Sequence, residues 1–121
     1  MQLCRYVAKL YHEEKREENR INVIALVASG KRVFGYGIND YTAMNKMARD
    51  NNYWSIHAEI AAITAANKVD GNDLYVYREY ARGGAALAMP CSICMNLIGK
   101  VGIRRVYYSI PLNPFWMELR L

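Results

Sequence analysis

The sequence lacks a long apolar run, a secretion signal and a disulfide framework. No apolar run approaches the roughly 20 residues that a membrane-spanning helix needs. The first residues, Met1 to Arg5, have neither the apolar stretch nor the cleavage site of a signal peptide. The sequence has three cysteines, and an odd number of cysteines cannot all be paired in disulfides within one chain. We therefore expect a cytoplasmic protein without a membrane partner.

Internal repeats and low-complexity segments are also absent, and the length of 121 residues is short for two domains. The hydrophobic fraction of 53% is sufficient for a packed core. We expect one domain over residues 1–121. The formal net charge of +5 favours anionic partners such as nucleotides or nucleic acid, although ordinary solvated surface explains such a surplus equally well.

Hydrophobic periodicity predicts helices at residues 2–17, 55–67 and 91–100. Residues rich in β-branched and aromatic side chains predict strands at 22–29, 32–37, 74–80, 104–109 and 115–119. Residues 38–54 and 81–89 are expected to be loops, and the first is long enough for a functional lid. This order predicts an α/β fold with a mixed five-stranded sheet and helices on its faces. The last two strands are joined by a connection too short for a parallel crossover, so they should form an antiparallel hairpin.

Two short motifs carry chemistry. His57-Ala58-Glu59 stands near one predicted helix start, and Pro90-Cys91-Ser92-Ile93-Cys94 opens another. One His and two Cys are zinc ligands, and three protein ligands leave the fourth tetrahedral position open for water, as in catalytic zinc sites. Because Cys91 and Cys94 are three residues apart, they lie on one helix face and can bind one metal ion.

Glu59 is not needed as a ligand, and a carboxylate beside a metal can act as general base and then as general acid. However, Glu59 and His57 are two residues apart, and such residues do not face each other on a helix. The two side chains converge only if the site lies off the N-terminal end of the helix. We expect that geometry.

The same residues also have structural explanations. One is that the two cysteines form half of a structural zinc site, but the sequence holds no second Cys or His pair to complete it. Another is a redox dithiol, which leaves His57 and Glu59 unexplained, and a third is that His57 is a core histidine. Cys4 is expected to be a free buried cysteine, and His12 a surface residue.

His-x-Glu followed by Pro-Cys-x-x-Cys about thirty residues later resembles the cytidine deaminase-like superfamily of zinc-dependent nucleobase deaminases. The resemblance covers the chain from about residue 21 to its end. It implies a three-layer α-β-α fold, one Zn²⁺ per chain and a catalytic Glu59. It also implies substrate contacts, and a homo-oligomer, either dimer or tetramer. The expected substrate-binding residues are Asn39, Ser55, Ala58 and Pro90, with Lys46, Arg49, Arg78 and Arg82 as candidates to meet a phosphate.

Signals for the branch of the superfamily conflict. The C-terminal hairpin resembles that of the branch that holds free-cytidine and blasticidin deaminases. A His as the first ligand instead resembles the branch that holds tRNA adenosine, dCMP and polynucleotide cytosine deaminases. The main hypothesis is deamination of a cytosine-type base in a free nucleoside or nucleotide. The alternatives are deamination within single-stranded DNA or RNA, and a non-catalytic zinc-containing module that binds nucleotides.

Overall fold

The computed structural model describes residues 3–17, 21–39 and 57–121. Its helices are α1 (Cys4–Glu17), α3 (Ala58–Ala65) and α4 (Ser92–Lys100). Its strands are β1 (Val23–Ser29), β2 (Arg32–Ile38), β3 (Asp73–Glu79), β4 (Ala85–Ala86), β5 (Arg105–Ser109) and β6 (Trp116–Arg120). Each of these helices, and each strand except β4, lies within two or three residues of a range that the sequence predicts. The predicted lid at 38–54 lies almost entirely outside the described residues.

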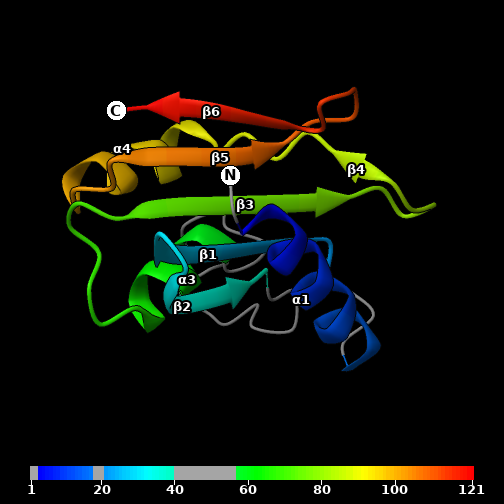
Figure 1. Cartoon of the computed structure of the whole chain (residues 1–121), viewed down its shortest axis with the longest axis horizontal. Coiled ribbons are helices and arrows are strands. Elements are labelled where there is room, and N and C mark those ends of the chain that lie inside the picture. The colour runs from blue at the N-terminus through cyan, green and yellow to red at the C-terminus, as the bar shows by residue number, and fades with distance from the viewer. Residues whose placement is uncertain (1–2, 18–20, 40–56) are drawn as a thin grey trace, which may run out of the picture.

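The strands form one mixed sheet in the order β2-β1-β3-β5-β6, with β4 paired to β3 (Figure 1). Strand β1 is antiparallel to both β2 and β3, and β3 is parallel to β5. Strands β5 and β6 are antiparallel, which confirms the predicted C-terminal hairpin. The described part of the sheet has six strands instead of the expected five, because the two-residue β4 falls within a segment predicted as loop.

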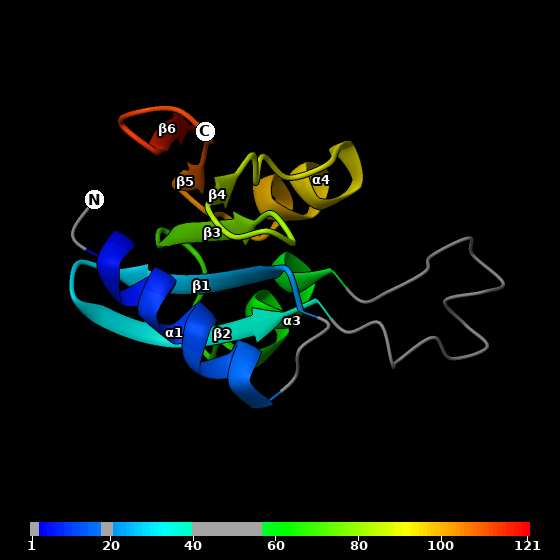
Figure 2. The same ribbon diagram turned by 90° about the vertical axis from the view of Figure 1, so that its right-hand side faces the viewer.

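Alternating residues of the central strands build two cores. In β3, Leu74 and Val76 pack on the face covered by α3 and α4, and Tyr75 and Tyr77 pack on the face covered by α1. Figure 2 shows α3 and α4 together on one side of the sheet. This period of two is expected of a strand buried on both faces. The three-layer α-β-α fold is thereby confirmed.

Helix α1 covers its face with an apolar stripe that includes Val7 and Tyr11, which are 0% and 1% exposed. The ring of Tyr11 meets that of Tyr77 edge to face, with 5.4 Å between centroids. On the outer side of the helix, His12 Nε2 lies 2.6 Å from Glu79 Oε2, and the His12 side chain is 60% exposed. His12 is therefore a surface residue, as expected, and it links α1 to the end of β3.

Cys4 lies on the inner side of α1 and is partly buried against this core. Burial raises the pKa of its thiol to about 11. The thiol is therefore protonated at neutral pH, which agrees with a packing role. Within the described residues, no helix combines the length and apolar character needed to cross a membrane.

Two glycines of β2 bring α3 close to the sheet. A Cβ added at Gly37 would lie 2.5 Å from the backbone nitrogen of Ala62, and one added at Gly35 would lie 2.7 Å from that of Ala66. Cβ atoms are not found so close to backbone atoms. Only glycine therefore allows this approach, and the small side chains of α3, such as Ala58 and Ala62, complete the contact. The approach sets how close α3 lies to the sheet.

Candidate metal and active site

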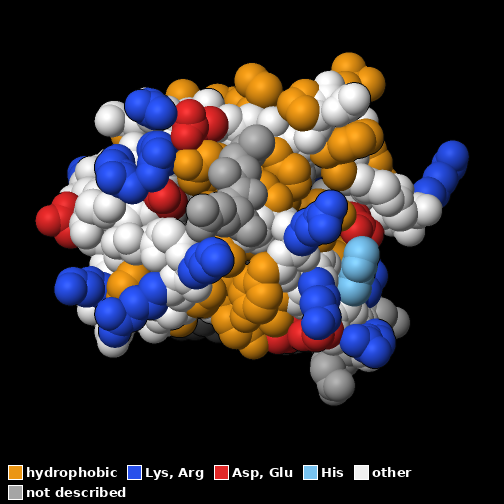
Figure 3. Space-filling model, viewed as in Figure 1, with side chains coloured by type: hydrophobic (Ala, Val, Ile, Leu, Met, Phe, Trp, Pro, Cys, Tyr) orange, Lys and Arg blue, Asp and Glu red, His pale blue; other side chains and the backbone are white. Residues whose placement is uncertain are grey.

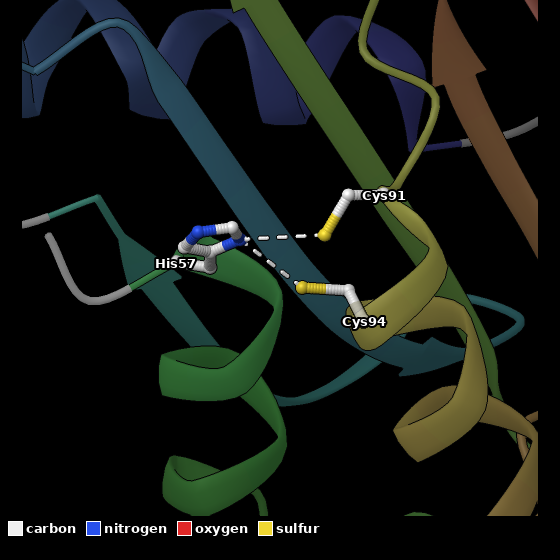
Figure 4. Close-up of side chains that lie close together, drawn as sticks. All are labelled: His57, Cys91 and Cys94. Atoms are coloured by element: carbon white, nitrogen blue, oxygen red, sulfur yellow. Dashed lines mark hydrogen bonds between the residues drawn. The ribbon is translucent and has the colours of Figure 1, made fainter. Parts of the chain in front are cut away.

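The site forms where the first turns of α3 and α4 meet (Figure 4). His57 is the N-cap of α3, with φ −71° and ψ 141°, and Cys91 is the N-cap of α4, with φ −69° and ψ 168°. An N-cap commonly uses its side chain to accept a hydrogen bond from the first helical turn, but neither of these residues does so. Both side chains instead extend beyond the helix ends toward each other, which is the geometry expected from the motif spacing.

The ligand atoms of His57, Cys91 and Cys94 all lie within 4.8 Å of one another. His57 Nδ1 is 3.2 Å from Cys94 Sγ and 3.8 Å from Cys91 Sγ. Zn–N and Zn–S bonds of ordinary length in a tetrahedral site separate N and S by about 3.6 Å. The two distances lie on either side of that value, so this donor set fits one zinc ion with little movement.

The two cysteines differ in their surroundings. Cys91 is exposed, whereas Cys94 is fully buried. Burial raises the pKa of the Cys94 thiol far above its ordinary value, and the charge of Glu59 and a hydrogen bond with Cys91 raise it further. Binding of a metal ion must therefore displace a proton from Cys94. The partial positive charge at the start of α4 favours the resulting thiolate.

Glu59 is the second residue of α3 and is 7% exposed. Its side chain lies close enough to Cys94 to raise the pKa of that thiol through its charge and a hydrogen bond. The side chain of Glu59 thus converges, as expected, with the ligand cluster formed by His57, Cys91 and Cys94. It does so because all four residues lie at the starts of α3 and α4. A buried carboxylate in this place is suited to proton transfer.

A pocket of about 270 Å³ opens beside the ligand cluster. Its walls come from the starts of β1 and α3, the segment after β2, the end of β3, and the chain that leads into α4. The residues lining it are Asn22, Val23, Asn39, His57, Ala58, Glu59, Val76, Arg78, Leu87, Ala88, Met89 and Cys91. Glu59, His57 and Cys91 thus share one cavity in which polar groups stand among apolar ones, and such a combination suits a small-molecule site.

Asn39 follows β2 directly and is 5% exposed. Its Oδ1 accepts hydrogen bonds from the backbone nitrogens of Asn22, at 3.0 Å, and Val23, at 2.9 Å. These bonds fix the orientation of the amide. Its Nδ2 is buried and has no partner among the described residues. Because a buried donor without a partner costs free energy, this group at the pocket wall is available to a ligand.

The other residues expected to bind substrate occupy different positions. Ala58 is buried and lines the pocket. Pro90 is buried between Met89 and Cys91, which line the pocket on either side of it. Ser55 lies outside the described residues. Of the four candidates for phosphate contact, Arg78 lines the pocket, Arg82 is exposed on the turn before β4, and Lys46 and Arg49 lie outside the described residues.

Ser109 supports the pocket wall and was not anticipated from the sequence. It is fully buried at the end of β5, where its Oγ accepts a hydrogen bond from the Arg78 backbone nitrogen and donates one to the Ala86 carbonyl oxygen. Its own carbonyl accepts a bond from the Ala88 backbone nitrogen. The bonds to Ala86 and Ala88 attach residues 86–88 to the end of β5, and the bond from Arg78 ties β3 to the same point. A single serine at a strand end gives no sequence signal for this role.

Residues 1–110 match the family described as the cytidine and deoxycytidylate deaminase zinc-binding region. Among solved structures, the apo dCMP deaminase of cyanophage S-TIM5 superposes with a TM-score of 0.62, 20% identity, and coverage of 93% of this chain and 86% of the phage chain. The same phage enzyme in complex with dCMP and dUMP superposes with a TM-score of 0.60 and 19% identity, and the superposition covers 90% of this chain and 82% of the phage chain.

A structure from studies of A-to-I editing by tRNA:A34 deaminases at the wobble position of transfer RNA has a TM-score of 0.53 and 25% identity, with coverage of 87% of this chain and 72% of that chain. Comparison with curated protein sequences finds no match. The similarity to the phage enzyme is a similarity of fold.

Proposed function

The chain belongs to the family of the cytidine and deoxycytidylate deaminase zinc-binding region, and we propose that it hydrolyses the exocyclic C–N bond of a cytosine-type base in a free nucleoside or nucleotide. The observation that carries the proposal is the buried carboxylate of Glu59 in the same pocket as the ligand cluster. A zinc site that serves only folding does not need that carboxylate.

His57, Cys91 and Cys94 would hold one Zn²⁺ per chain, and three protein ligands leave a fourth position for water. When bound, the metal supplies acidity that makes a water nucleophilic near neutral pH. The starts of α3 and α4 position the three donor atoms at separations that suit one zinc ion.

Glu59 moves the protons. As general base it accepts a proton from the attacking water, and as general acid it passes a proton to the departing amine. The base thus gains a carbonyl oxygen at C4 and loses ammonia, so one water is consumed for each ammonia released. Because the carboxylate is buried, the proton stays between the reacting groups.

The remaining pocket residues would hold the substrate. The Asn39 Nδ2, fixed by the two bonds to its Oδ1, would donate to an acceptor on the sugar or the base. Ala58 and the backbone around Pro90 would lie against the base, and Ser55 remains a proposed contact. We also propose that residues 1–121 act as one domain and assemble as a homo-oligomer.

A second candidate is deamination within a polynucleotide, which the similarity to a tRNA:A34 deaminase favours. A nucleic-acid surface usually gathers its basic side chains along one face. On the face that carries α1, Lys and Arg side chains lie apart, with hydrophobic and acidic groups between them (Figure 3). A free nucleoside or nucleotide is our main proposal, and the assay with an oligonucleotide distinguishes the two candidates.

Ammonia release from zinc-loaded protein tests the proposal. Cytidine, deoxycytidine, their monophosphates, adenosine and a cytosine-containing single-stranded oligonucleotide are offered in parallel. We expect turnover of a free cytosine compound, and a loss of about 10²–10⁴-fold in Glu59→Gln with the zinc content unchanged. Turnover of the oligonucleotide alone, or equal activity in Glu59→Gln, would contradict the proposal.

A further inference from the structure

Arg78 is the one Lys or Arg among the described residues that lines the pocket. It lies on β3 two residues beyond Val76, so both side chains belong to the face that carries α3 and α4. Val76 is 1% exposed, whereas Arg78 is exposed. Since residues two apart on a strand are separated by roughly 7 Å, Arg78 stands at the open end of the pocket.

The carboxylate nearest along the strand does not neutralise Arg78. Glu79 belongs to the opposite face of the sheet, where its Oε2 lies 2.6 Å from both His12 Nε2 and the hydroxyl of Tyr77. Directly across the sheet, Arg78 is paired with Val23 on β1 and with Ala86 on β4, which are apolar. Cross-strand partners share a face, so these positions offer no acid either.

No carboxylate of the described residues forms an ion pair with the Arg78 guanidinium. The backbone nitrogen of Arg78 is bonded to Ser109 Oγ, which fixes the base of the side chain. An arginine that no carboxylate of the described residues neutralises, held at the mouth of a pocket, is suited to an anionic ligand. Its planar fork of donors matches the oxygens of a phosphate.

The pocket therefore has three functional groups in different places. Glu59 is buried inside beside His57 and Cys91, the Asn39 Nδ2, which has no partner among the described residues, lies on the wall, and the Arg78 cation is at the open end. A nucleotide presents a base, sugar hydroxyls and a phosphate in that sequence. We propose that Arg78 binds the 5′-phosphate of the substrate, so that the enzyme prefers a nucleoside monophosphate to a nucleoside. This proposal rests on the proposed function of the same pocket.

The test compares kcat/KM for deoxycytidine monophosphate and deoxycytidine in zinc-loaded wild type and Arg78→Gln. Loss of a charged hydrogen-bonding group should reduce kcat/KM for the monophosphate by about 10- to 100-fold. The value for deoxycytidine should change little. Arg78→Lys keeps the charge but lacks the planar fork of donors, so its kcat/KM for the monophosphate should lie between those of the wild type and Arg78→Gln. Arg82→Gln is the matched control, because Arg82 is an exposed arginine of the same hairpin that does not line the pocket.

A binding measurement separates failure of this inference from failure of the proposed function. Titration calorimetry with dUMP and deoxyuridine should show tighter binding of dUMP to the wild type, and loss of that difference in Arg78→Gln. If dUMP is preferred through Arg78 but nothing is deaminated, the inference holds and the proposed function fails.

Three results would overturn the inference. One is an equal affinity of the wild type for dUMP and deoxyuridine. Another is a reduction of kcat/KM in Arg78→Gln that is equal for deoxycytidine monophosphate and deoxycytidine. The third is an effect of this variant on oligonucleotide turnover without one on the monophosphate, because that result would assign Arg78 to a backbone phosphate.

Discussion

Replacement of Gly37 by alanine should damage the site from a distance. The added Cβ would lie 2.5 Å from both the Ala61 Cβ and the Ala62 backbone nitrogen, whereas ordinary contact begins at 3.4 Å. Because one of the atoms met is helix backbone, a rotamer change cannot relieve the contact, and α3 must move away by roughly 1 Å. Overpacking of this kind costs about 1–3 kcal/mol, and the lower unfolded-state entropy of alanine offsets about 0.4–1 kcal/mol of it.

We expect Gly37→Ala to lower the free energy of unfolding by about 1–2 kcal/mol, measured by urea denaturation of zinc-loaded protein. Since α3 carries His57 and Glu59, a shift near 1 Å should also reduce kcat/KM by about 100-fold. Gly99→Ala is the control: Gly99 lies in α4, an added Cβ there meets nothing within 4 Å, and alanine should stabilise the helix by about 0.5–1 kcal/mol. Wild-type stability and activity in Gly37→Ala would refute the close packing of α3 on β2.

Three further predictions concern the ligands, the pocket wall and the buried tyrosines. Cys94→Ser should lose most bound zinc, measured as metal per chain, and should lower the thermal midpoint, because metal binding is linked to folding; a full zinc content would remove Cys94 from the ligand set. Asn39→Asp keeps the acceptor for the two backbone nitrogens but replaces the unpartnered donor, so kcat/KM should fall by about 10-fold or more, and unchanged kinetics would exclude a substrate contact. Burial raises the pKa of Tyr11 and of Tyr75 from 10.0 to about 12; the unfolded chain releases these protons first, so stability should be unaffected below pH 10 and should fall between pH 10 and 12. Urea denaturation across that range checks this, and Tyr75→Phe should show a shallower decline.

Much of this fold could be predicted because its signals are local. The alternation in β3 and the apolar stripe of α1 follow directly from the periods of strand and helix. The short link between β5 and β6 permits only an antiparallel pair, and that inference is confirmed. The site geometry also followed from spacing, since His57 and Glu59 can serve one centre only at a helix start.

The features that sequence reasoning missed depend on contacts between distant segments. β4 consists of two alanines after a pair of glycines, which have no strand period, and it exists because it pairs with the end of β3. The role of Ser109 depends on three bonds to β3 and to residues 86–88, none of which is near it in the chain. The Asn39 Nδ2, which has no partner among the described residues, likewise becomes evident only once the backbone nitrogens of Asn22 and Val23 are seen to occupy the Asn39 oxygen.

The placement of the proposed metal ligands at two helix starts has a consequence for how the proposed activity would acquire new substrates. His57, Cys91 and Cys94 belong to helices packed on the core, whereas Arg78, Leu87 and Met89 belong to the β3–β4 hairpin and the chain after it. The turn of that hairpin, residues 80–84, is exposed. Insertions and substitutions there reshape the entrance while the reacting groups keep their separation. Selection can therefore change what the site accepts without first having to rebuild how it reacts.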